Sequence, residues 1–394
     1  MTKEEESIYD GEHGWAKQTC MKILVRLGDL FNATRLIPIS SAHVSGVSYK
    51  NLGDAGLEWL EEQAGLGARA RIKATLNPAG MDLDLWREMG VPEEFAQEQE
   101  RVIGAFERMG VEPTCTCTPY LVGHVPVFGS QVAWAESSAV CFANSVIGAR
   151  TNRESGPTSL ASAVTGLAAL YGYRLDEDRR PGDVVDVTVE LHDPMDYSAL
   201  GYIVGKRLGT VVPYFTGLRR PGLESMKALG AACATSGGIA LWHGEGVTPE
   251  AEAMRGHLEG LERIVVGKTD LEEAMAWLTR PLDDPIIALG CPHSSLREME
   301  EIAGLIRGKD LGGRLWVFTS RGVYAEAERA GYVGAIEGAG GRVYRDTCMV
   351  VAPLREMGWT EVATNSFKAA HYLANMGLET RIGTIRELLE EAGG

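Results

Sequence analysis

The chain changes character at residues 285–295, which read PIIALGCPHSS. The first five residues are apolar and predict a buried strand, and a charged segment that predicts a helix begins near Leu296. Cys291 therefore falls at the carboxyl end of a strand and faces a helix N-terminus, where a thiol is readily held as a thiolate.

The same alternation of strand and helix continues to the C-terminus. Further strands are expected at 315–318, 341–345 and 361–364, and a helix at 366–376. This pattern predicts a doubly wound α/β domain with a mostly parallel sheet, whose sites lie at the carboxyl ends of strands. Four candidate positions fall there: Cys291, Thr319-Ser320, Cys348 and Asn365-Ser366.

The first 178 residues predict a separate N-terminal α/β domain. A helix is expected over 3–33, a strand edge at 139–142, and an uncharged helix from Pro157 to about Tyr171. Charged stretches with Pro or Gly at 175–182 and 280–285 predict two boundaries. The expected domains are therefore an N-terminal domain (1–178), a middle α/β domain (179–282) and the C-terminal doubly wound domain (283–394).

The composition is that of a soluble globular protein with a strong negative charge. Its 54 acidic and 38 basic residues give a net charge of −16, which argues against nonspecific nucleic-acid binding and against an anionic membrane surface. A small anionic substrate would need a local basic pocket. The acidic N-terminus does not resemble a signal peptide, and seven cysteines without disulfide-like spacing favour the cytoplasm.

Thiols occur at three separated strand ends or loops: Cys291, Cys348, and the pair Cys115 and Cys117. This distribution favours a metal or iron–sulfur site assembled by the fold. No Cys-x-x-Cys motif is present, so buried thiols without a metal remain the alternative. Cys20, Cys141 and Cys233 are interpreted as small buried hydrophobic residues.

A polar loop at 142–157, FANSVIGARTNRESGP, contains two arginines next to an expected helix N-terminus. Guanidinium groups and free helix N–H groups both bind carboxylate or phosphate, although a solvated connector would have a similar composition. His43 and His293 are candidates for proton transfer, and hydrogen-bonded core histidines are the alternative. Lys368 either pairs with an anion or lies on a helix surface.

Six segments, in order along nearly the whole chain, resemble the large subunit of the aconitase X family. They are ISSAHVSGVSY (39–49), TCTPY (116–120), NSVIGARTNRE (144–154), GCPH (290–293), DTCM (346–349) and TNS (364–366) with Lys368. Ser155 replaces a glycine of the family pattern, and Phe367 stands at a position expected to be small.

The resemblance implies an aconitase-like fold, with several α/β domains and mostly parallel sheets around a central cleft. It also implies a hydro-lyase with an iron–sulfur cluster, of the [4Fe-4S] type, held by three cysteines. The ligand candidates are Cys117, Cys291 and Cys348, with Cys115 as the alternative to Cys117. His43 and His293 are the catalytic candidates. The candidates for substrate binding are Ser45, Asn144, Ser145, Arg150, Arg153, Glu154, Asn365, Ser366 and Lys368.

The resemblance further implies a partner, a separate small subunit that supplies a catalytic serine, so that the enzyme is a heterodimer. The expected reaction is dehydration of (R)-5-phosphomevalonate to trans-anhydromevalonate 5-phosphate in the archaeal mevalonate pathway of isoprenoid biosynthesis. That substrate has two anionic ends, which call for two basic sites. Dehydration of cis-3-hydroxy-L-proline and a non-catalytic iron–sulfur protein are the alternatives.

Overall fold

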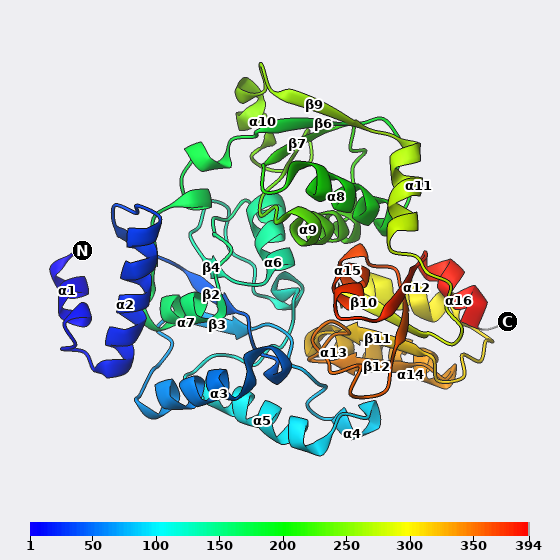
Figure 1. Cartoon of the computed structure of the whole chain (residues 1–394), viewed down its shortest axis with the longest axis horizontal. Helices are drawn as coiled ribbons and strands as arrows, with labels where there is room; N and C mark the ends of the chain where they lie inside the picture. The colour runs from blue at the N-terminus through cyan, green and yellow to red at the C-terminus, as the bar shows by residue number, and fades with distance from the viewer. Residues whose placement is uncertain (393–394) are drawn as a thin grey trace.

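The structure is a computed structural model that describes residues 1–392 of the 394-residue chain. Its strands form sheets of two, three, four and five strands. Every strand pairing in the three larger sheets is parallel within these residues, whereas the two-stranded sheet is antiparallel. The predicted α/β class with mostly parallel sheets is confirmed, and Figure 1 shows the sheets in three parts of the molecule.

The N-terminal part is built on the three-stranded sheet, in the order β3-β2-β4. One apolar core joins this sheet to helices α2, α3, α5 and α7. The elements are α1 (Lys3–Tyr9), α2 (Trp15–Leu30), β1 (Leu36–Pro38), β2 (Ser41–Val44), α3 (Tyr49–Gly65), β3 (Lys73–Leu76), α4 (Trp86–Met89), α5 (Glu93–Arg108), η1 (Pro119–Val122), β4 (Ala133–Trp134), α6 (Ser137–Phe142), η2 (Ala143–Ile147), α7 (Gly156–Thr165) and β5 (Leu167–Ala169).

The middle part contains the four-stranded sheet, in the order β8-β7-β6-β9, with helices α8 and α9 packed together beside it (Figure 1). A Cβ added at Gly201 would lie 2.4 Å from the Leu229 carbonyl oxygen, so the close packing of these two helices requires glycine. The elements are η3 (Gly172–Arg174), η4 (Glu177–Arg179), β6 (Asp183–Val187), α8 (Pro194–Leu208), β7 (Pro213–Thr216), α9 (Leu223–Gly237), β8 (His243–Gly244), α10 (Ala251–Met254), η5 (Arg255–His257), β9 (Glu262–Val266) and α11 (Lys268–Trp277).

The C-terminal part contains the five-stranded parallel sheet, in the order β12-β11-β10-β13-β14. The chain moves outward from β10 to β12 and then returns to β13 on the other side, so the switch point lies between β10 and β13. The elements are β10 (Ile286–Ser294), α12 (Leu296–Leu305), β11 (Leu315–Thr319), α13 (Arg321–Arg329), α14 (Tyr332–Gly338), β12 (Arg342–Arg345), β13 (Glu361–Thr364), α15 (Phe367–Asn375), β14 (Glu379–Ile382) and α16 (Ile385–Ala392).

Shared apolar cores hold the three parts together. Phe367 and Ala370 of α15 lie in the core of the middle part, together with Cys141 of α6. Met81 and Trp86 of the N-terminal part pack in the core beneath the five-stranded sheet. Helices α6, α9 and α15 consequently lie near the centre of the molecule, where the three parts meet (Figure 1).

Three local predictions were wrong. The helix expected over 3–33 is two helices, because Gly11 and Gly14 adopt positive φ angles of 95° and 93° between them. The helix expected to reach Tyr171 ends at Thr165, where Gly166 takes the left-handed cap position. The strand edge expected at 139–142 is instead part of helix α6.

Within the described residues, no helix has both the length and the apolar character needed to cross a bilayer.

Candidate active site

Cys291 lies at the carboxyl end of β10, as the sequence predicts. The preceding Gly290 has a φ of 98°, and a Cβ there would lie 2.1 Å from the Phe318 carbonyl oxygen. Only glycine therefore permits the chain to turn at this point. Cys348 follows strand β12, which β11 separates from β10, and Cys117 comes from the N-terminal part just before η1. Three distant segments thus supply the three predicted ligand thiols.

These three thiols influence one another electrostatically. Burial raises the pKa of each to about 12. A negative charge on Cys348 further raises the pKa of Cys117, one on Cys117 raises that of Cys291, and one on Cys291 raises that of Cys348. The Lys368 ammonium lowers the pKa of all three. Each thiol is therefore near enough to another, and to Lys368, for their charges to interact, and Cys291 and Cys348 also share one apolar core.

Cys115 behaves differently from Cys117, although only one residue separates them. It has a φ of 42° and lies in the apolar core of the N-terminal part. Burial and the Asp346 carboxylate raise the pKa of its thiol, and the other three thiols are not among the causes. Cys117, in contrast, accepts a hydrogen bond from the His293 backbone N–H at 3.3 Å. The geometry favours Cys117 over Cys115 as a member of the thiol group.

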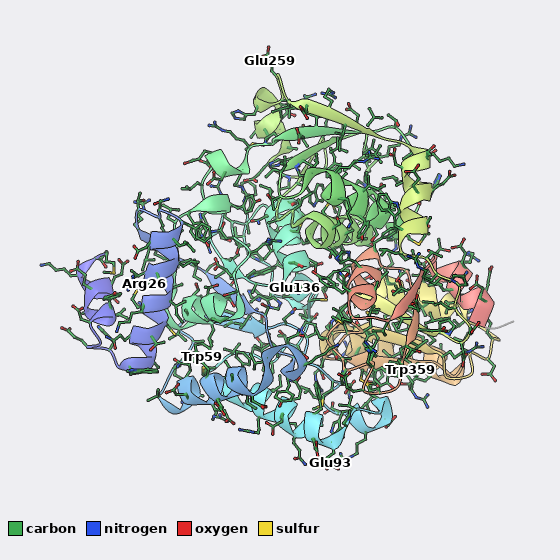
Figure 2. The ribbon with its side chains drawn as sticks, viewed as in Figure 1. Arg26, Trp59, Glu93, Glu136, Glu259 and Trp359 are labelled. Atoms are coloured by element: carbon green, nitrogen blue, oxygen red, sulfur yellow. The ribbon has the colours of Figure 1, made fainter. Side chains whose placement is uncertain are left out.

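Glu136 and Lys368 form a buried ion pair beside the thiols. Lys368 lies in the first turn of α15 and also donates to the Ser138 hydroxyl at 3.2 Å. Glu136 caps α6 and accepts from Asn77 Nδ2 at 3.2 Å. Burial alone would raise the pKa of the Glu136 carboxyl, but Lys368 and Ser138 lower it to about 2. The carboxylate is therefore ionised at neutral pH, and Figure 2 shows it at the centre of the molecule.

Sequence reasoning missed Glu136 and Asn77. Glu136 precedes a short apolar run that also fits a strand edge, and a single carboxylate in that pattern gives no functional signal. A carboxylate followed by Ser137 and Ser138 is also a helix N-cap pattern, and that signal could have drawn attention to it.

The two predicted catalytic histidines are both fully buried, but their surroundings differ. His293 Nε2 donates to the Thr347 carbonyl at 2.8 Å, so Nδ1 accepts from the Thr116 hydroxyl at 3.0 Å. Burial lowers the pKa of His293 to about 4. With both nitrogens engaged, this ring is a hydrogen-bonded core histidine that supports the thiol region.

His43 has one nitrogen available. Its Nδ1 shares a hydrogen bond of 2.8 Å with the Thr75 hydroxyl, which also bonds His124 Nδ1 at 2.8 Å. His43 Nε2 and the nearby Asn77 Oδ1 have no hydrogen-bond partner among the described residues. Burial lowers the pKa of His43 to about 4, against the attraction of the Glu136 charge. A neutral imidazole with a free nitrogen is suited to proton exchange.

The polar loop at 142–157 holds the N-terminal and middle parts together. Arg150 pairs with Asp176 at 2.5 Å and with Glu250 at 3.7 Å, and Glu154 pairs with the buried Arg174 at 2.9 Å. Arg150 and Glu154 thus already have ion-pair partners within the protein, and their predicted substrate contacts stay predictions.

Asn144 and Ser145 are likewise engaged within the fold. Asn144 Nδ2 donates to the carbonyls of Thr151 and Ala240, each at 2.9 Å, and the Ser145 hydroxyl accepts from the Trp242 backbone N–H at 2.9 Å. Arg153 differs from its neighbours, because it is exposed and has no ion-pair partner in residues 1–392.

The remaining predicted residues lie close to Cys291 or at the start of the loop before α3. Ser366 interacts with the Cys291 thiol and caps α15, and Asn365 lines the same small cavity as Cys291. That cavity borders a larger one of about 670 Å³ between the middle and C-terminal parts, which Asn365 also lines. Ser45 is half-buried, and its carbonyl oxygen would lie 2.6 Å from a Cβ at Gly156, which ties this loop to the start of α7.

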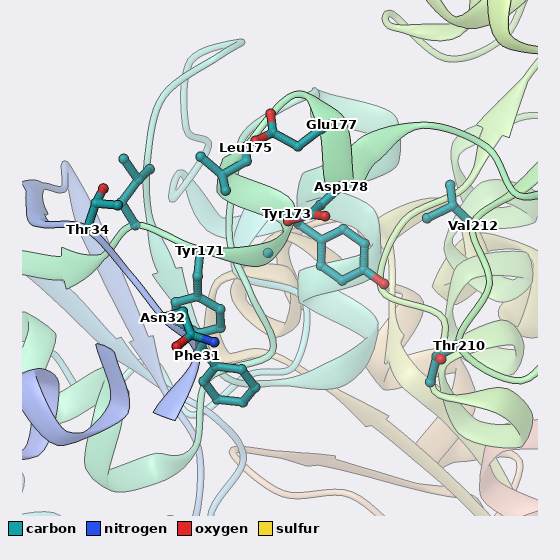
Figure 3. Close-up of a pocket in the computed structure, with 12 residues that line it drawn as sticks. Phe31, Asn32, Thr34, Tyr171, Tyr173, Leu175, Glu177, Asp178, Thr210 and Val212 are labelled. Carbon is teal, nitrogen blue, oxygen red and sulfur yellow. The ribbon is translucent and has the colours of Figure 1, made fainter. Parts of the chain in front are cut away.

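A different cavity of about 640 Å³ lies between the N-terminal and middle parts (Figure 3). Phe31 and Tyr171 stack on one side of it at a ring distance of 4.5 Å, and Glu177 and Asp178 lie on the other. It shares no residue with the cavity that contains Cys291.

No group of three His, Cys, Asp or Glu side chains within residues 1–392 has an arrangement that would bind a single metal ion.

Three family models cover most of the chain. They are described as the first, second and third domains of aconitase X and match residues 1–177, 181–276 and 285–394.

Curated relatives match along the full length. The phosphomevalonate dehydratase large subunits of Methanothermobacter thermautotrophicus and Methanocaldococcus jannaschii are 52% and 49% identical. The first match covers 95% of this chain and 94% of the relative, and the second covers 99% of each. The cis-3-hydroxy-L-proline dehydratase of Pseudomonas aeruginosa is 37% identical over 99% of this chain, but only 69% of that protein is matched.

A solved structure is also similar, the holo-form of Thermococcus kodakaraensis aconitase X. It has 45% sequence identity and a TM-score of 0.94, with 99% of each chain covered.

Proposed function

The chain belongs to the aconitase X family, and we propose that it is the large, catalytic subunit of an iron–sulfur dehydratase that acts on (R)-5-phosphomevalonate. The observation that carries the proposal is the group of Cys117, Cys291 and Cys348 around the Lys368 ammonium. Four relatives named for phosphomevalonate are 43–52% identical over nearly the full chain, and a fifth, from Aeropyrum pernix, is 35% identical; the four support the substrate assignment.

The donor set fits an iron–sulfur cluster. Such clusters are held by thiolates, and the three thiols come from three segments that meet in one region. Their pKa values near 12 mean that they are protonated without a metal and must lose protons when one binds. We assign Cys117, Cys291 and Cys348 as the ligands of a [4Fe-4S] cluster, which when bound would supply an iron that acts as a Lewis acid.

The protein's own residues would orient the substrate. Dehydration of a 3-hydroxy acid requires loss of a proton next to the carboxylate and departure of the hydroxyl group. Lys368 is a cation whose charge acts on all three thiols, and it would attract the carboxylate end, with Asn365 and Ser366 lining the cavity of Cys291. Glu136 holds the Lys368 ammonium in place. The exposed Arg153 is the candidate for the phosphate end.

His43 would accept or donate a proton during the reaction. Its free Nε2 lies near Asn77 and is coupled to the charge of Glu136, and the ring is neutral at physiological pH. Glu136 cannot serve as a proton donor at neutral pH, because its pKa is about 2. A partner subunit would supply the serine that removes the substrate proton.

The requirement for a partner is supported by the lengths of the relatives. The cis-3-hydroxy-L-proline dehydratases match nearly all of this chain, yet only 69% and 65% of their own length is matched. The full-length relatives are instead named large subunits. We infer that the segment that those dehydratases carry in addition corresponds to a separate small subunit here.

The test is anaerobic co-expression with the small subunit of the same organism, followed by iron analysis, electron paramagnetic resonance and a dehydratase assay. Turnover of (R)-5-phosphomevalonate with little turnover of cis-3-hydroxy-L-proline is the expected result. Comparable or faster turnover of cis-3-hydroxy-L-proline would contradict the substrate assignment. A protein that contains iron but turns over neither substrate would contradict the catalytic role.

A further inference from the structure

Lys227 is a buried lysine of the middle part that reaches the turn after Cys291. It lies on α9, is 3% exposed, and donates from Nζ to the His293 carbonyl oxygen at 2.9 Å. The Pro292 carbonyl lies 3.5 Å away, at the outer limit of a hydrogen bond. Lys227 also pairs with Glu298 of α12. A buried ammonium is tolerated only when it is paired and hydrogen-bonded, so this arrangement is specific.

The turn that Lys227 contacts has left the sheet ladder. Residue pairing between β10 and β11 passes from Leu289 opposite Val317 to Ser294 opposite Thr319, so five steps on β10 match two on β11. Residues 290–293 therefore bulge out of the sheet, and their backbone groups need other partners. The His293 N–H donates to Cys117 and its carbonyl accepts from Lys227.

Helix α9 also holds the chain just past the turn. Glu224, one helical turn before Lys227, accepts from the Ser295 hydroxyl at 2.9 Å. The Glu298 carboxylate bonded to Lys227 also accepts from the Ser295 backbone N–H at 2.7 Å, as part of the cap of α12. The segment that follows Cys291 is thus connected twice to one helix, at His293 and at Ser295, and that helix also packs on α6, which carries Glu136 at its start.

We propose that Lys227 is a positioning residue that fixes the turn at 290–293, so that the Cys291 thiol keeps its position relative to the thiols of Cys117 and Cys348. The proposal deepens the proposed function, because Cys291 is an iron–sulfur ligand there. Lys227 contacts the backbone of the turn and lines the same small cavity as Cys291. Its loss would loosen the turn that carries Cys291 and weaken the bond from the His293 N–H to Cys117, while Cys348, which follows β12, would stay in place.

The test measures the reactivity of each thiol in the full-length chain after chelation of iron. Iodoacetamide labelling followed by peptide mass spectrometry gives separate rates for Cys117, Cys291 and Cys348. In Lys227→Met, Cys291 should be labelled about tenfold faster than in the parent chain, because a hydrogen bond from a charged donor is lost and the turn opens more often. The rate at Cys117 should rise less, because one hydrogen bond from the turn reaches it, and the rate at Cys348 should stay unchanged.

Matched variants separate positioning from simple loss of a buried charge. Lys227→Met leaves Glu298 without its partner, whereas the double variant Lys227→Met/Glu298→Gln leaves no unpaired charge and still lacks the donor to His293. The double variant should still show fast labelling that is selective for Cys291. If the single variant does not fold, the double variant is used for the test in its place. Lys227→Arg, which keeps a donor, should restore part of the protection.

Lys268→Met is the control, since Lys268 is also a helix lysine paired with a glutamate, but its side chain is 81% exposed. In this control, the three thiols should be labelled at the same rates as in the parent chain. Equal acceleration at all three thiols, no acceleration at Cys291, or full recovery in the double variant would each overturn the positioning role.

A second readout separates this inference from the proposed function. Anaerobic release of iron to a chelator should be faster in Lys227→Met and in the double variant than in the parent chain. If the parent chain binds no iron at all, the proposed function fails, while the labelling pattern still decides the role of Lys227. If iron is bound and labelling is unchanged in Lys227→Met, the proposed function stands and the positioning role fails.

Discussion

Two buried ion-pair clusters connect different parts of this protein, and they differ in how completely their polar atoms are used. The first, which we call the interdomain network, consists of Arg150, Arg174, Arg179, Glu154 and Glu250. The single side chain of Arg179 donates hydrogen bonds to Glu250, to the side chain of Asn144 and to the Tyr173 carbonyl. The second is the Glu136 and Lys368 pair, beside which lie the three thiols, and near which His43 Nε2 and Asn77 Oδ1 have no hydrogen-bond partner in the described residues.

The comparison teaches how to separate structural charges from functional ones. Both clusters are buried and both contain residues that a motif-based reading would assign to an anion site. In the interdomain network each guanidinium already has a carboxylate, so no charge is left over for a ligand. At the second cluster, unsatisfied donors and acceptors face a common region, which is costly unless a ligand or cofactor binds there.

The largest expected effect is at the second cluster. Lys368→Met should lower turnover of the two-subunit enzyme by at least about 10³-fold, because the cation that attracts the substrate carboxylate is lost and Glu136 is left buried and unpaired. Steady-state kinetics on (R)-5-phosphomevalonate measure it. Turnover within tenfold of the parent enzyme would place the functional cation elsewhere.

Arg179→Met should break the interdomain network without affecting the thiols. Removing a buried partner of Glu250 should lower the free energy of unfolding by about 3–5 kcal/mol, while the iron content per folded molecule stays unchanged. Urea unfolding and iron analysis measure the two quantities. Arg307→Met, which changes an exposed arginine, is the control and should change stability by less than about 0.5 kcal/mol. Loss of iron in Arg179→Met would show that the two clusters are not independent.

The pH dependence of stability should reveal His43. Its folded-state pKa of about 4 lies below the ordinary value of 6.5, so the unfolded chain binds the proton more readily between these pH values. Stability should therefore rise with pH from about 4 to 6.5, with His43 contributing roughly 3 kcal/mol across the window. In His43→Gln that part of the slope should disappear from urea unfolding measured at several pH values, and an unchanged slope would contradict a buried neutral His43.

The smallest expected effect concerns Arg153, the exposed arginine next to the interdomain network. Arg153→Ala should change stability by less than about 0.5 kcal/mol. It should raise the KM for phosphomevalonate about fivefold, as expected for a solvent-exposed ionic contact. Arg150→Ala, its closest counterpart, should instead lower stability more than it alters KM. An unchanged KM in Arg153→Ala would remove the whole loop from the substrate site.

Much of the C-terminal part was predictable from its sequence, because strands such as Leu315–Thr319 are short apolar runs between charged helices. The aconitase-like fold and the family were also predicted, since six motifs kept their order along the chain. The local sequence pattern gave a wrong prediction where one segment fits both a strand and a helix. Residues 139–142 are apolar enough for a strand, but a capping carboxylate at Glu136 starts a helix there.

The roles of the charged residues could not be predicted, because their partners are distant in sequence. Arg150 meets Glu250 only after the N-terminal and middle parts have packed together. Lys368 meets Glu136 across 232 residues. Residue type and spacing indicate that a charge is present, whereas only the folded chain shows whether it is already neutralised.

The central claim is that Cys117, Cys291 and Cys348 form one iron–sulfur site from which Cys115 is excluded. The direct measurement is iron content and electron paramagnetic resonance of anaerobically purified Cys117→Ser and Cys115→Ser, two substitutions of neighbouring buried thiols. The account predicts that Cys117→Ser loses the iron–sulfur signal and that Cys115→Ser keeps it. Retention of the signal in Cys117→Ser, with its loss in Cys115→Ser, would contradict the account.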